Sequence, residues 1–364
     1  MIKGQETVLR PIQGGDFWQP LRWFALLTIL WLVSACGGGE KEPYRVVLAG
    51  SDGIYSVGVD GAGLARLSDV RHGRLPSLSP DASRIVWLCG EGQDSYDLCI
   101  SKLDGTDQRN LTDGRVPLNR PWSFGPVWLR DGSRVAFLAH DYLYFVNVDG
   151  TELRRVYDKV YGNLEPGALS PDGKRILDQR QANAHYEVFA ADLEDISEVK
   201  LADFRHPFYP LQAWSPEGDK VVFVDEDGRT LHFADTRAGT LDSVSADSQI
   251  NVYVLPAWSP DGSRVAFATW DRPGSSIFTV NADGTDLKRI ADPGLVSWLP
   301  SPADSAVVWS PDGRQIFYIG HSETCAAGGC TPGFLHVVNS DGTGEMRLTG
   351  ALAYGILGFQ GQPE

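Results

Sequence analysis

One short phrase recurs six times along the chain, and it limits the possible folds more than any other feature. In its fullest form it reads Ser-Pro-Asp-Gly, and its acidic positions are Asp81, Asp131, Asp172, Glu217, Asp261 and Asp312. Successive acidic positions are 50, 41, 45, 44 and 51 residues apart. A period of about 40–50 residues is typical of architectures that repeat one structural unit many times.

Each unit contains four segments that favour short β-strands. An apolar pair such as Ala257-Trp258 precedes the turn, and an apolar run such as Val265–Phe267 follows it. Pro, Asp and Gly together favour a tight reversal of the chain between them. A third strand ends in an Asp-Gly hairpin signal such as Asp283-Gly284, and a short fourth strand closes the unit, as at Arg109–Thr112. Four antiparallel strands per unit predict one blade of a β-propeller.

The two ends of the repeat region complement each other. Residues 45–68 read as the second, third and fourth strands of a blade without a first strand, whereas residues 354–359 read as a first strand without the other three. Together they form one composite blade. The sequence therefore predicts an all-β propeller over residues 44–360, with seven four-stranded blades, closed by N- and C-terminal strands that share a blade. The uneven spacing of the repeats leaves six or eight blades open.

The N-terminal residues indicate export. Residues 23–33 form an apolar stretch after Arg22 that is too short for a comfortable membrane span and fits a signal-peptide core. The following residues, Val33-Ser34-Ala35-Cys36, resemble a bacterial lipobox, in which the cysteine is acylated and becomes the new N-terminus. We therefore expect a lipoprotein signal peptide at residues 1–35, a lipid on Cys36 and a Gly-rich tether at residues 36–43. The alternative is an ordinary secretory signal in which Cys36 is incidental.

This reading places the protein in the bacterial cell envelope, on the periplasmic side of the outer membrane or at the cell surface. The other cysteines agree with an oxidising compartment. Cys89 and Cys99 flank the loop between the second and third strands of the first full unit, and Cys325 and Cys330 flank the corresponding loop of the last. Each pair is placed to form a disulfide across a hairpin. The alternative for the second pair is a metal site, but no four-ligand zinc motif is present and no metal is predicted.

The charge of the chain argues against nucleic acid as a partner. The formal net charge is −15, and the acidic residues are spread over all the repeats. Binding to phosphate requires a basic face, which this composition does not offer.

The full repeat resembles that of a known family. Trp-Ser-Pro-Asp-Gly followed by Asn-x-Asp-Gly-Thr and Arg-x-Leu-Thr looks like the WD40-like repeat of TolB-type propellers, and the resemblance covers residues 44–360. The same repeat builds TolB, the propellers of prolyl oligopeptidase-like peptidases and some polysaccharide lyases. TolB has an α/β domain before its propeller, where this chain has only residues 36–43. No Gly-x-Ser-x-Gly motif is present, which excludes the serine peptidase chemistry of that fold.

The loops differ between repeats, so they are the better place to look for function. Loops between the second and third strands, and connections from a fourth strand to the next blade, should meet on one face around the central opening. Arginine and aromatic residues, which often anchor interfaces, are frequent in these connections. The candidate binding residues are Arg120, Trp122, Phe124, Tyr161, His206, Phe208, Tyr209, Tyr253 and Trp298. The alternative is that these side chains only cover the top of the ring.

The sequence predicts no catalytic residue. The repeated acidic residues are expected to serve the turns, and the seven histidines do not recur at one position of the blades. The predicted function is therefore that of a non-enzymatic, lipid-anchored propeller. It binds an unidentified envelope protein or other macromolecule and contacts the membrane only through its lipid. Two alternatives stay open. One is a metal-dependent carbohydrate-active enzyme, with His72, His206 and His321 as the histidines to examine, and the other is a sensor domain for a small ligand.

Overall fold

The computed structural model describes most of the chain after residue 43. The described residues are 44–70, 75–90, 96–116, 125–139, 142–157, 168–183, 185–205, 212–225, 228–245, 251–252, 256–271, 274–296, 307–321, 333–350 and 353–361. The chain divides into two compact units, residues 1–41 and 42–364, and every described residue belongs to the second.

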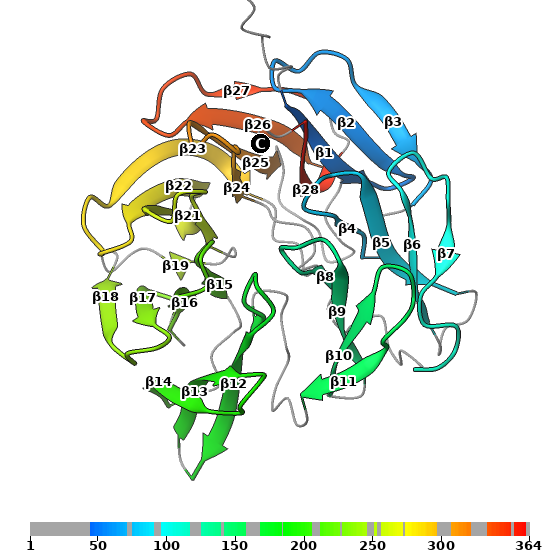
Figure 1. The fold of residues 1–364 in the computed structure, drawn as a ribbon. Coiled ribbons are helices and arrows are strands. Elements are labelled where there is room, and N and C mark those ends of the chain that lie inside the picture. Colours follow the sequence, from blue (N-terminus) through cyan, green and yellow to red (C-terminus); the bar gives the residue numbers. More distant parts are fainter. Residues whose placement is uncertain are drawn as a thin grey trace, which may run out of the picture. The chain divides into compact units, whose positions relative to one another are not determined.

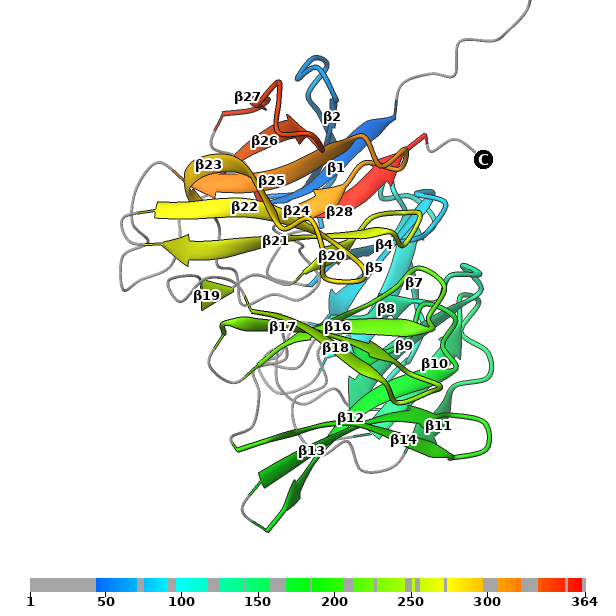
Figure 2. The same ribbon diagram turned by 90° about the vertical axis from the view of Figure 1, so that its left-hand side faces the viewer.

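The second unit is a seven-bladed β-propeller, and its described residues contain no α-helix (Figures 1 and 2). The strands form six antiparallel sheets, one of which comprises two neighbouring blades. These two blades are joined because Leu295 and Val296 at the end of one pair with residues of the next. The predicted fold class is confirmed, and seven is the number of blades.

The composite blade has the strand order β28–β1–β2–β3, and the six full blades follow it along the chain. The strands of the composite blade are β28 (Ala353–Gln360), β1 (Arg45–Gly50), β2 (Ile54–Gly58) and β3 (Ala65–Ser68). Blade 1 contains β4 (Ser77–Leu78), β5 (Arg84–Cys89), β6 (Asp97–Lys102) and β7 (Arg109–Asn110). Blade 2 contains β8 (Val127–Trp128), β9 (Arg134–Ala139), β10 (Tyr142–Asn147) and β11 (Arg154–Tyr157).

Blade 3 is the least regular of the full blades, because its innermost position is a single bridge between Leu169 and Ile176. Its strands are β12 (Arg175–Ala182), β13 (His185–Asp192) and β14 (Glu198–Phe204). Blade 4 contains β15 (Gln212–Trp214), β16 (Lys220–Val224), β17 (Thr230–Asp235) and β18 (Leu241–Ser245). Blade 5 contains β19 (Asn251–Val252), β20 (Ala257–Trp258), β21 (Arg264–Asp271), β22 (Gly274–Asn281) and β23 (Lys288–Val296). Blade 6 contains β24 (Val307–Trp309), β25 (Gln315–His321), β26 (Phe334–Asn339) and β27 (Met346–Arg347).

Strand β1 closes the ring. It pairs with β28 on one side and β2 on the other, so segments from the two ends of the propeller form one sheet. Its side chains alternate between two hydrophobic clusters. Val46 and Leu48 pack in a cluster with Phe317 of blade 6, whereas Val47 and Ala49 pack in a cluster with Ile85 of blade 1. The period of two along a strand thus buries both faces of β1 and links the first and last full blades.

Four buried tryptophans connect the inner strands of neighbouring blades. Each indole N–H donates a hydrogen bond of 2.9–3.0 Å to a backbone carbonyl of the preceding blade. The donors are Trp128, Trp214, Trp258 and Trp309, and their acceptors are Ser77, Ala168, Ala213 and Ala257. These tryptophans therefore belong to the core.

The repeated turn is held by its own side chains. In four of the six copies the serine Oγ donates to the aspartate Oδ1 at 2.6 Å, as Ser259 does to Asp261. The same Oγ accepts a bond from the backbone N–H five residues later, which for Ser259 is that of Arg264, at 2.9 Å. The fourth copy has Glu217 at the acidic position, and Ser215 donates instead to Asp219.

Candidate functional site

Polar side chains gather on one face of blade 3. His185, Glu187 and Phe189 alternate along β13, so they point to the same side of the sheet. The register places Glu187 opposite Arg180 of β12 and Asp203 of β14. Two connected groups of charged residues result, one at the β12–β13 hairpin end and one along the seam with blade 2.

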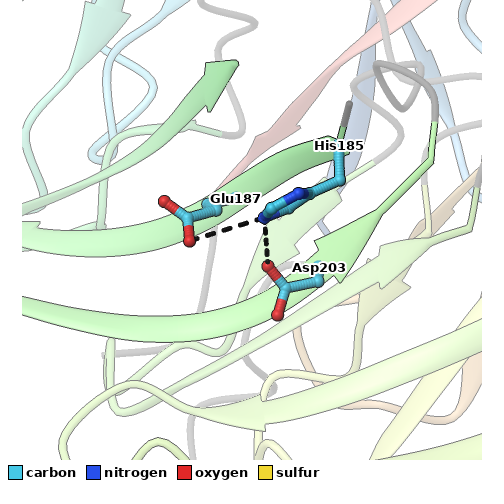
Figure 3. A group of neighbouring side chains, drawn as sticks. All are labelled: His185, Glu187 and Asp203. Atoms are coloured by element: carbon cyan, nitrogen blue, oxygen red, sulfur yellow. Dashed lines mark ion pairs between the residues drawn. The ribbon is translucent and has the colours of Figure 1, made fainter. Parts of the chain in front are cut away.

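We call the first group the His185 cluster; it consists of His185, Glu187, Lys200 and Asp203. The His185 Nε2 lies 3.6 Å from Glu187 Oε1 and 3.4 Å from Asp203 Oδ1 (Figure 3). Lys200 Nζ lies between the same two carboxylates, 2.6 Å from Glu187 Oε1 and 2.8 Å from Asp203 Oδ1. Two carboxylates directly opposite each other repel, and the ammonium group offsets that repulsion.

A β-bulge assembles this cluster. Lys200 and Asp203 are three positions apart, which in a regular strand places their side chains on opposite faces. Between the pairs Val188–Ala202 and Phe189–Lys200 the register shifts, so Leu201 is the extra residue. The shift returns Lys200 to the face of Asp203. For this reason the cluster could not be predicted from the sequence, in which the only signal was the His-x-Glu alternation at residues 185–187.

The electrostatics of the His185 cluster follow from its hydrogen bonds. The bond from Lys200 is the main cause that holds the pKa of Glu187 below its ordinary value. The bonds to Asp203 and Glu187 raise the pKa of Lys200. The cluster therefore carries a charged Lys200 ammonium beside an ionised Glu187 carboxylate at neutral pH.

The His185 cluster has the donor atoms of a metal site. One ligand atom each from His185, Glu187 and Asp203 lie within 4.8 Å of one another, and no other such group of His, Cys, Asp and Glu occurs among the described residues. One imidazole nitrogen and two carboxylate oxygens suit a divalent transition metal. In this structure Lys200 supplies the cation that these oxygens face.

We call the second group the Arg180 network; it consists of Tyr157, Asp178, Arg180 and Glu198. Arg180 Nε donates to Asp178 Oδ2 at 2.8 Å, and its two terminal nitrogens donate to the two oxygens of Glu198. Tyr157, at the end of blade 2, donates to Asp178 Oδ2 at 3.3 Å. Only 1% of the Asp178 side chain is exposed, so the network buries a carboxylate in the seam between two blades.

Burial dominates the titration of this network. It raises the pKa of Asp178, although Arg180 opposes the shift. Burial, together with the nearby Asp178 charge, raises the pKa of Tyr157 to about 12. Contacts with Glu198 and Asp178 keep Arg180 charged. These are the properties of a paired structural network, and the arrangement holds blades 2 and 3 in register.

The candidate residues predicted from the sequence fall largely outside the described residues. All nine residues of the predicted binding face lie there, and so do Cys36, Cys325, Cys330, His72 and His206. His321 ends β25, but its side chain is not described. Their roles stay predictions.

One predicted disulfide is present. Cys89 and Cys99 are bonded, with their Cα atoms 5.8 Å apart, and the bond connects β5 to β6 within blade 1. This part of the cysteine prediction is confirmed.

Comparison with known proteins gives the fold. No protein-family model and no curated protein matches the sequence. Among solved structures, an oligogalacturonate lyase in complex with manganese is similar with a TM-score of 0.57 and 14% identity, covering 84% of each chain. A puromycin hydrolase is similar with a TM-score of 0.56 and 13% identity over 85% of this chain, which spans about half (52%) of that protein.

The similar solved structures also include TolB from Acinetobacter baumannii. It has a TM-score of 0.47 and 16% identity, and it covers 88% of this chain and 82% of that one. At these identities a likeness is one of fold, and nothing more is carried over from the TolB structure. The chain is thus a seven-bladed β-propeller, an architecture that supports many unrelated functions.

Proposed function

We propose that this protein is a lipid-anchored propeller of the bacterial cell envelope that binds a protein or other macromolecule. Binding takes place through the loop face, the side of the ring where the connections between blades and the loops between second and third strands are expected to meet. The observation that carries the proposal is how the repeated polar residues are used. Asp81, Asp131, Asp172, Asp261 and Asp312 each accept hydrogen bonds within their own turns. The repeated acidic residues therefore stabilise the turns of the ring. The loops that differ between blades are then the segments that can provide binding specificity.

The charged end of blade 3 supports this choice of face. His185 is the first residue of β13, directly after the β12–β13 hairpin. Phe204 ends β14, and in the sequence it is followed by the connection that contains His206, Phe208 and Tyr209. Protein interfaces commonly combine an apolar centre with a polar rim. Under this proposal the aromatic residues of the connection supply the centre and the charged residues of blade 3 supply the rim.

The anchor is proposed from the lipobox-like residues at Cys36. Among the described residues there is no helix of the length and apolarity that crossing a membrane requires. Under this proposal the acyl chains on Cys36 provide the attachment, and the propeller remains on the aqueous side.

The first test addresses the anchor. Cys36→Ser removes the only proposed acylation site, so we expect the protein to lose label from radioactive palmitate and to move from the membrane to the aqueous fraction. The matched control is Cys99→Ser, which should remain labelled and membrane-bound. A Cys36→Ser protein that still fractionates with membranes contradicts the anchor.

The second test addresses the loop face. Proteins crosslinked to the membrane-bound wild type are identified by mass spectrometry, and capture is repeated with the triple variant Trp122→Ala, Phe208→Ala and Tyr209→Ala. Truncation of aromatic residues at the centre of an interface costs about 2 kcal/mol or more, so capture of a genuine partner should fall sharply. Asp261→Ala, in a turn, is the control. Normal capture by the triple variant contradicts the proposal.

A metal-dependent carbohydrate-active enzyme is the second candidate. It is supported by the shared fold with an oligogalacturonate lyase in complex with manganese and by the donor atoms of the His185 cluster. The position of Lys200 counts against it. Stoichiometric manganese or zinc in the purified protein, lost in a His185→Ala variant, would favour this candidate over a pure scaffold.

A further inference from the structure

Three metal-ligating side chains of the His185 cluster lie on one face of blade 3. His185 and Glu187 are two positions apart on β13, so their side chains point to the same side of the sheet. Asp203 of β14 is the cross-strand partner of Glu187. Figure 3 shows both carboxylates directed toward the same ring nitrogen of His185. A single ion can therefore reach all three side chains from one side of the sheet.

The distances between the donor atoms suit a tetrahedral zinc ion. The His185 Nε2 lies 3.4 Å from Asp203 Oδ1 and 3.6 Å from Glu187 Oε1. Two ligand atoms that are each about 2.0–2.1 Å from a tetrahedral ion are about 3.3–3.4 Å apart. Both distances in the cluster are longer than an ordinary hydrogen bond, so they fit joint coordination of one ion better than direct pairing of the imidazole with a carboxylate.

Lys200 is the group that a metal ion would replace. Its Nζ lies 2.6 Å from Glu187 Oε1 and 2.8 Å from Asp203 Oδ1, the same two oxygens that face His185. The lysine side chain is exposed. Exposed ion pairs contribute little to stability, and the flexible lysine stem can turn toward water. Lys200 therefore lowers the affinity of the cluster for a metal ion without blocking it.

The donor set selects among the divalent cations. One imidazole nitrogen with two carboxylate oxygens is a set that Zn²⁺ uses in proteins. Ca²⁺ requires several more oxygen ligands, and Mg²⁺ prefers an octahedral shell of oxygens, so neither suits this cluster. Mn²⁺ binds a given set of nitrogen and oxygen ligands more weakly than Zn²⁺ does.

We propose that the His185 cluster is a zinc site, in which His185, Glu187 and Asp203 bind Zn²⁺ and the ion displaces the Lys200 ammonium from the two carboxylates. Three protein ligands leave a coordination position for a further ligand such as water. The inference goes beyond the proposed scaffold function and rests on neither the anchor nor the loop face. Its test measures binding and not activity, so it is also separate from the question of an enzyme.

The first part of the test removes ligands. Calorimetry with ZnCl₂ is carried out on the full chain after removal of metal with EDTA. His185→Ala and Asp203→Asn change side chains that are 41% and 53% exposed, so the core is unaffected. We expect each to raise the Kd at least about tenfold, because even the outer partners of metal ligands have effects of that size. Zinc bound elsewhere in the chain remains in both variants, so the binding that both lose belongs to the cluster.

The second part removes the competing cation and should have the opposite effect. Lys200→Met keeps most of the stem but not the ammonium, so the affinity for zinc should rise about five- to thirtyfold, the effect of two exposed ion pairs. Lys174→Met is the matched control. It removes the same charge from an exposed lysine just before β12, whereas the His185 cluster lies beyond the other end of that strand. The Kd should remain nearly unchanged in this control.

The two parts together decide the proposal. It is overturned if the wild type binds no more zinc than His185→Ala does, or if Lys200→Met binds zinc no more tightly than the wild type. It is also overturned if Lys174→Met strengthens binding as much as Lys200→Met, or if MgCl₂ or CaCl₂ binds as tightly as ZnCl₂.

Discussion

Glycine, serine and aspartate set the local geometry of every blade, and at one glycine the surroundings add a second constraint. Gly173 has φ +69°, a conformation that only glycine adopts without strain, and a Cβ there would lie 2.7 Å from Leu129 Cδ2. Leu129 and Arg130 stand where most repeats have Ser and Pro. Because Arg130 has a backbone N–H, it donates to the Pro171 carbonyl of the neighbouring blade at 2.8 Å. The two residues by which blade 2 differs from the repeat, Leu129 and Arg130, therefore both contact the turn of blade 3.

Substitution of two glycines separates backbone strain from this contact. Gly114 has a similar φ of +67° but nothing within 4 Å of the added Cβ. We expect Gly114→Ala to cost about 1–2 kcal/mol of unfolding free energy from strain alone. Gly173→Ala should cost about 1–3 kcal/mol more from overpacking. Urea denaturation measures both, and adding Leu129→Ala should narrow the difference. Equal losses of unfolding free energy for the two substitutions would show that the Leu129 side chain moves aside without an energetic penalty.

The buried Asp178 carboxylate makes Arg180 a strong contributor to stability. Arg180→Met leaves that carboxylate without its cation, so we expect a loss of about 3 kcal/mol or more. Asp178→Asn in the same chain should restore much of it, because no buried charge then remains. Glu198→Gln affects a partly exposed partner and should cost under about 1 kcal/mol. Chemical denaturation of the four proteins gives the comparison. If the double variant is no more stable than Arg180→Met, the charge of Asp178 is not the cause.

At the scale of elements, β28 matters most because it supplies the missing first strand of the composite blade. Ile356 and Phe359 are buried in the cluster that contains Val46 and Phe317. Without β28, strand β1 would become the edge of its sheet and would expose unpaired backbone groups.

Deletion of residues 353–364 should therefore open the ring. We expect a lower Tm and concentration-dependent association, because the free edge of β1 can pair with another chain. Deletion of residues 361–364, which leaves β28 complete, is the control and should melt as the wild type does. Differential scanning calorimetry and light scattering measure these outcomes. A monomeric 353–364 deletion with the wild-type Tm would show that β28 does not close the ring.

Across the whole molecule, half-buried histidines in different blades couple stability to pH. His232 stacks on Phe223 in blade 4, and His336 stacks on Tyr318 in blade 6. Burial lowers the pKa of both histidines below the ordinary value of 6.5. The unfolded chain thus binds protons that the folded ring does not, so stability is full above pH 6.5 and falls as the pH drops toward the lowered folded-state pKa.

Replacing these histidines should reduce the pH dependence. Phe keeps the aromatic stacking but does not titrate, so the Tm of the His232→Phe, His336→Phe double variant should fall less than that of the wild type between about pH 7.5 and pH 5.5. Calorimetry at both pH values gives the two differences. An equal fall in Tm for the wild type and the double variant would show that groups other than these two histidines cause the pH dependence.

The strands, the turns and the closure of the ring could all be predicted from the sequence. These follow from local causes, because turn chemistry repeats with each blade and apolar residues alternate with the period of a strand. The incomplete units at residues 45–68 and 354–359 were sufficient to predict that the two ends share a blade. The Cys89–Cys99 bond was predictable because both residues flank one hairpin.

Which side chains meet between strands and between blades could not be predicted from the sequence and is seen in the folded ring. The bulge at Leu201 brings Lys200 to the face of Asp203, and nothing in the spacing of these residues indicates it. Tyr157 donates a hydrogen bond to Asp178 across the seam between blades 2 and 3. Such contacts depend on register shifts and on the packing of one sheet against the next, and strand periodicity specifies neither.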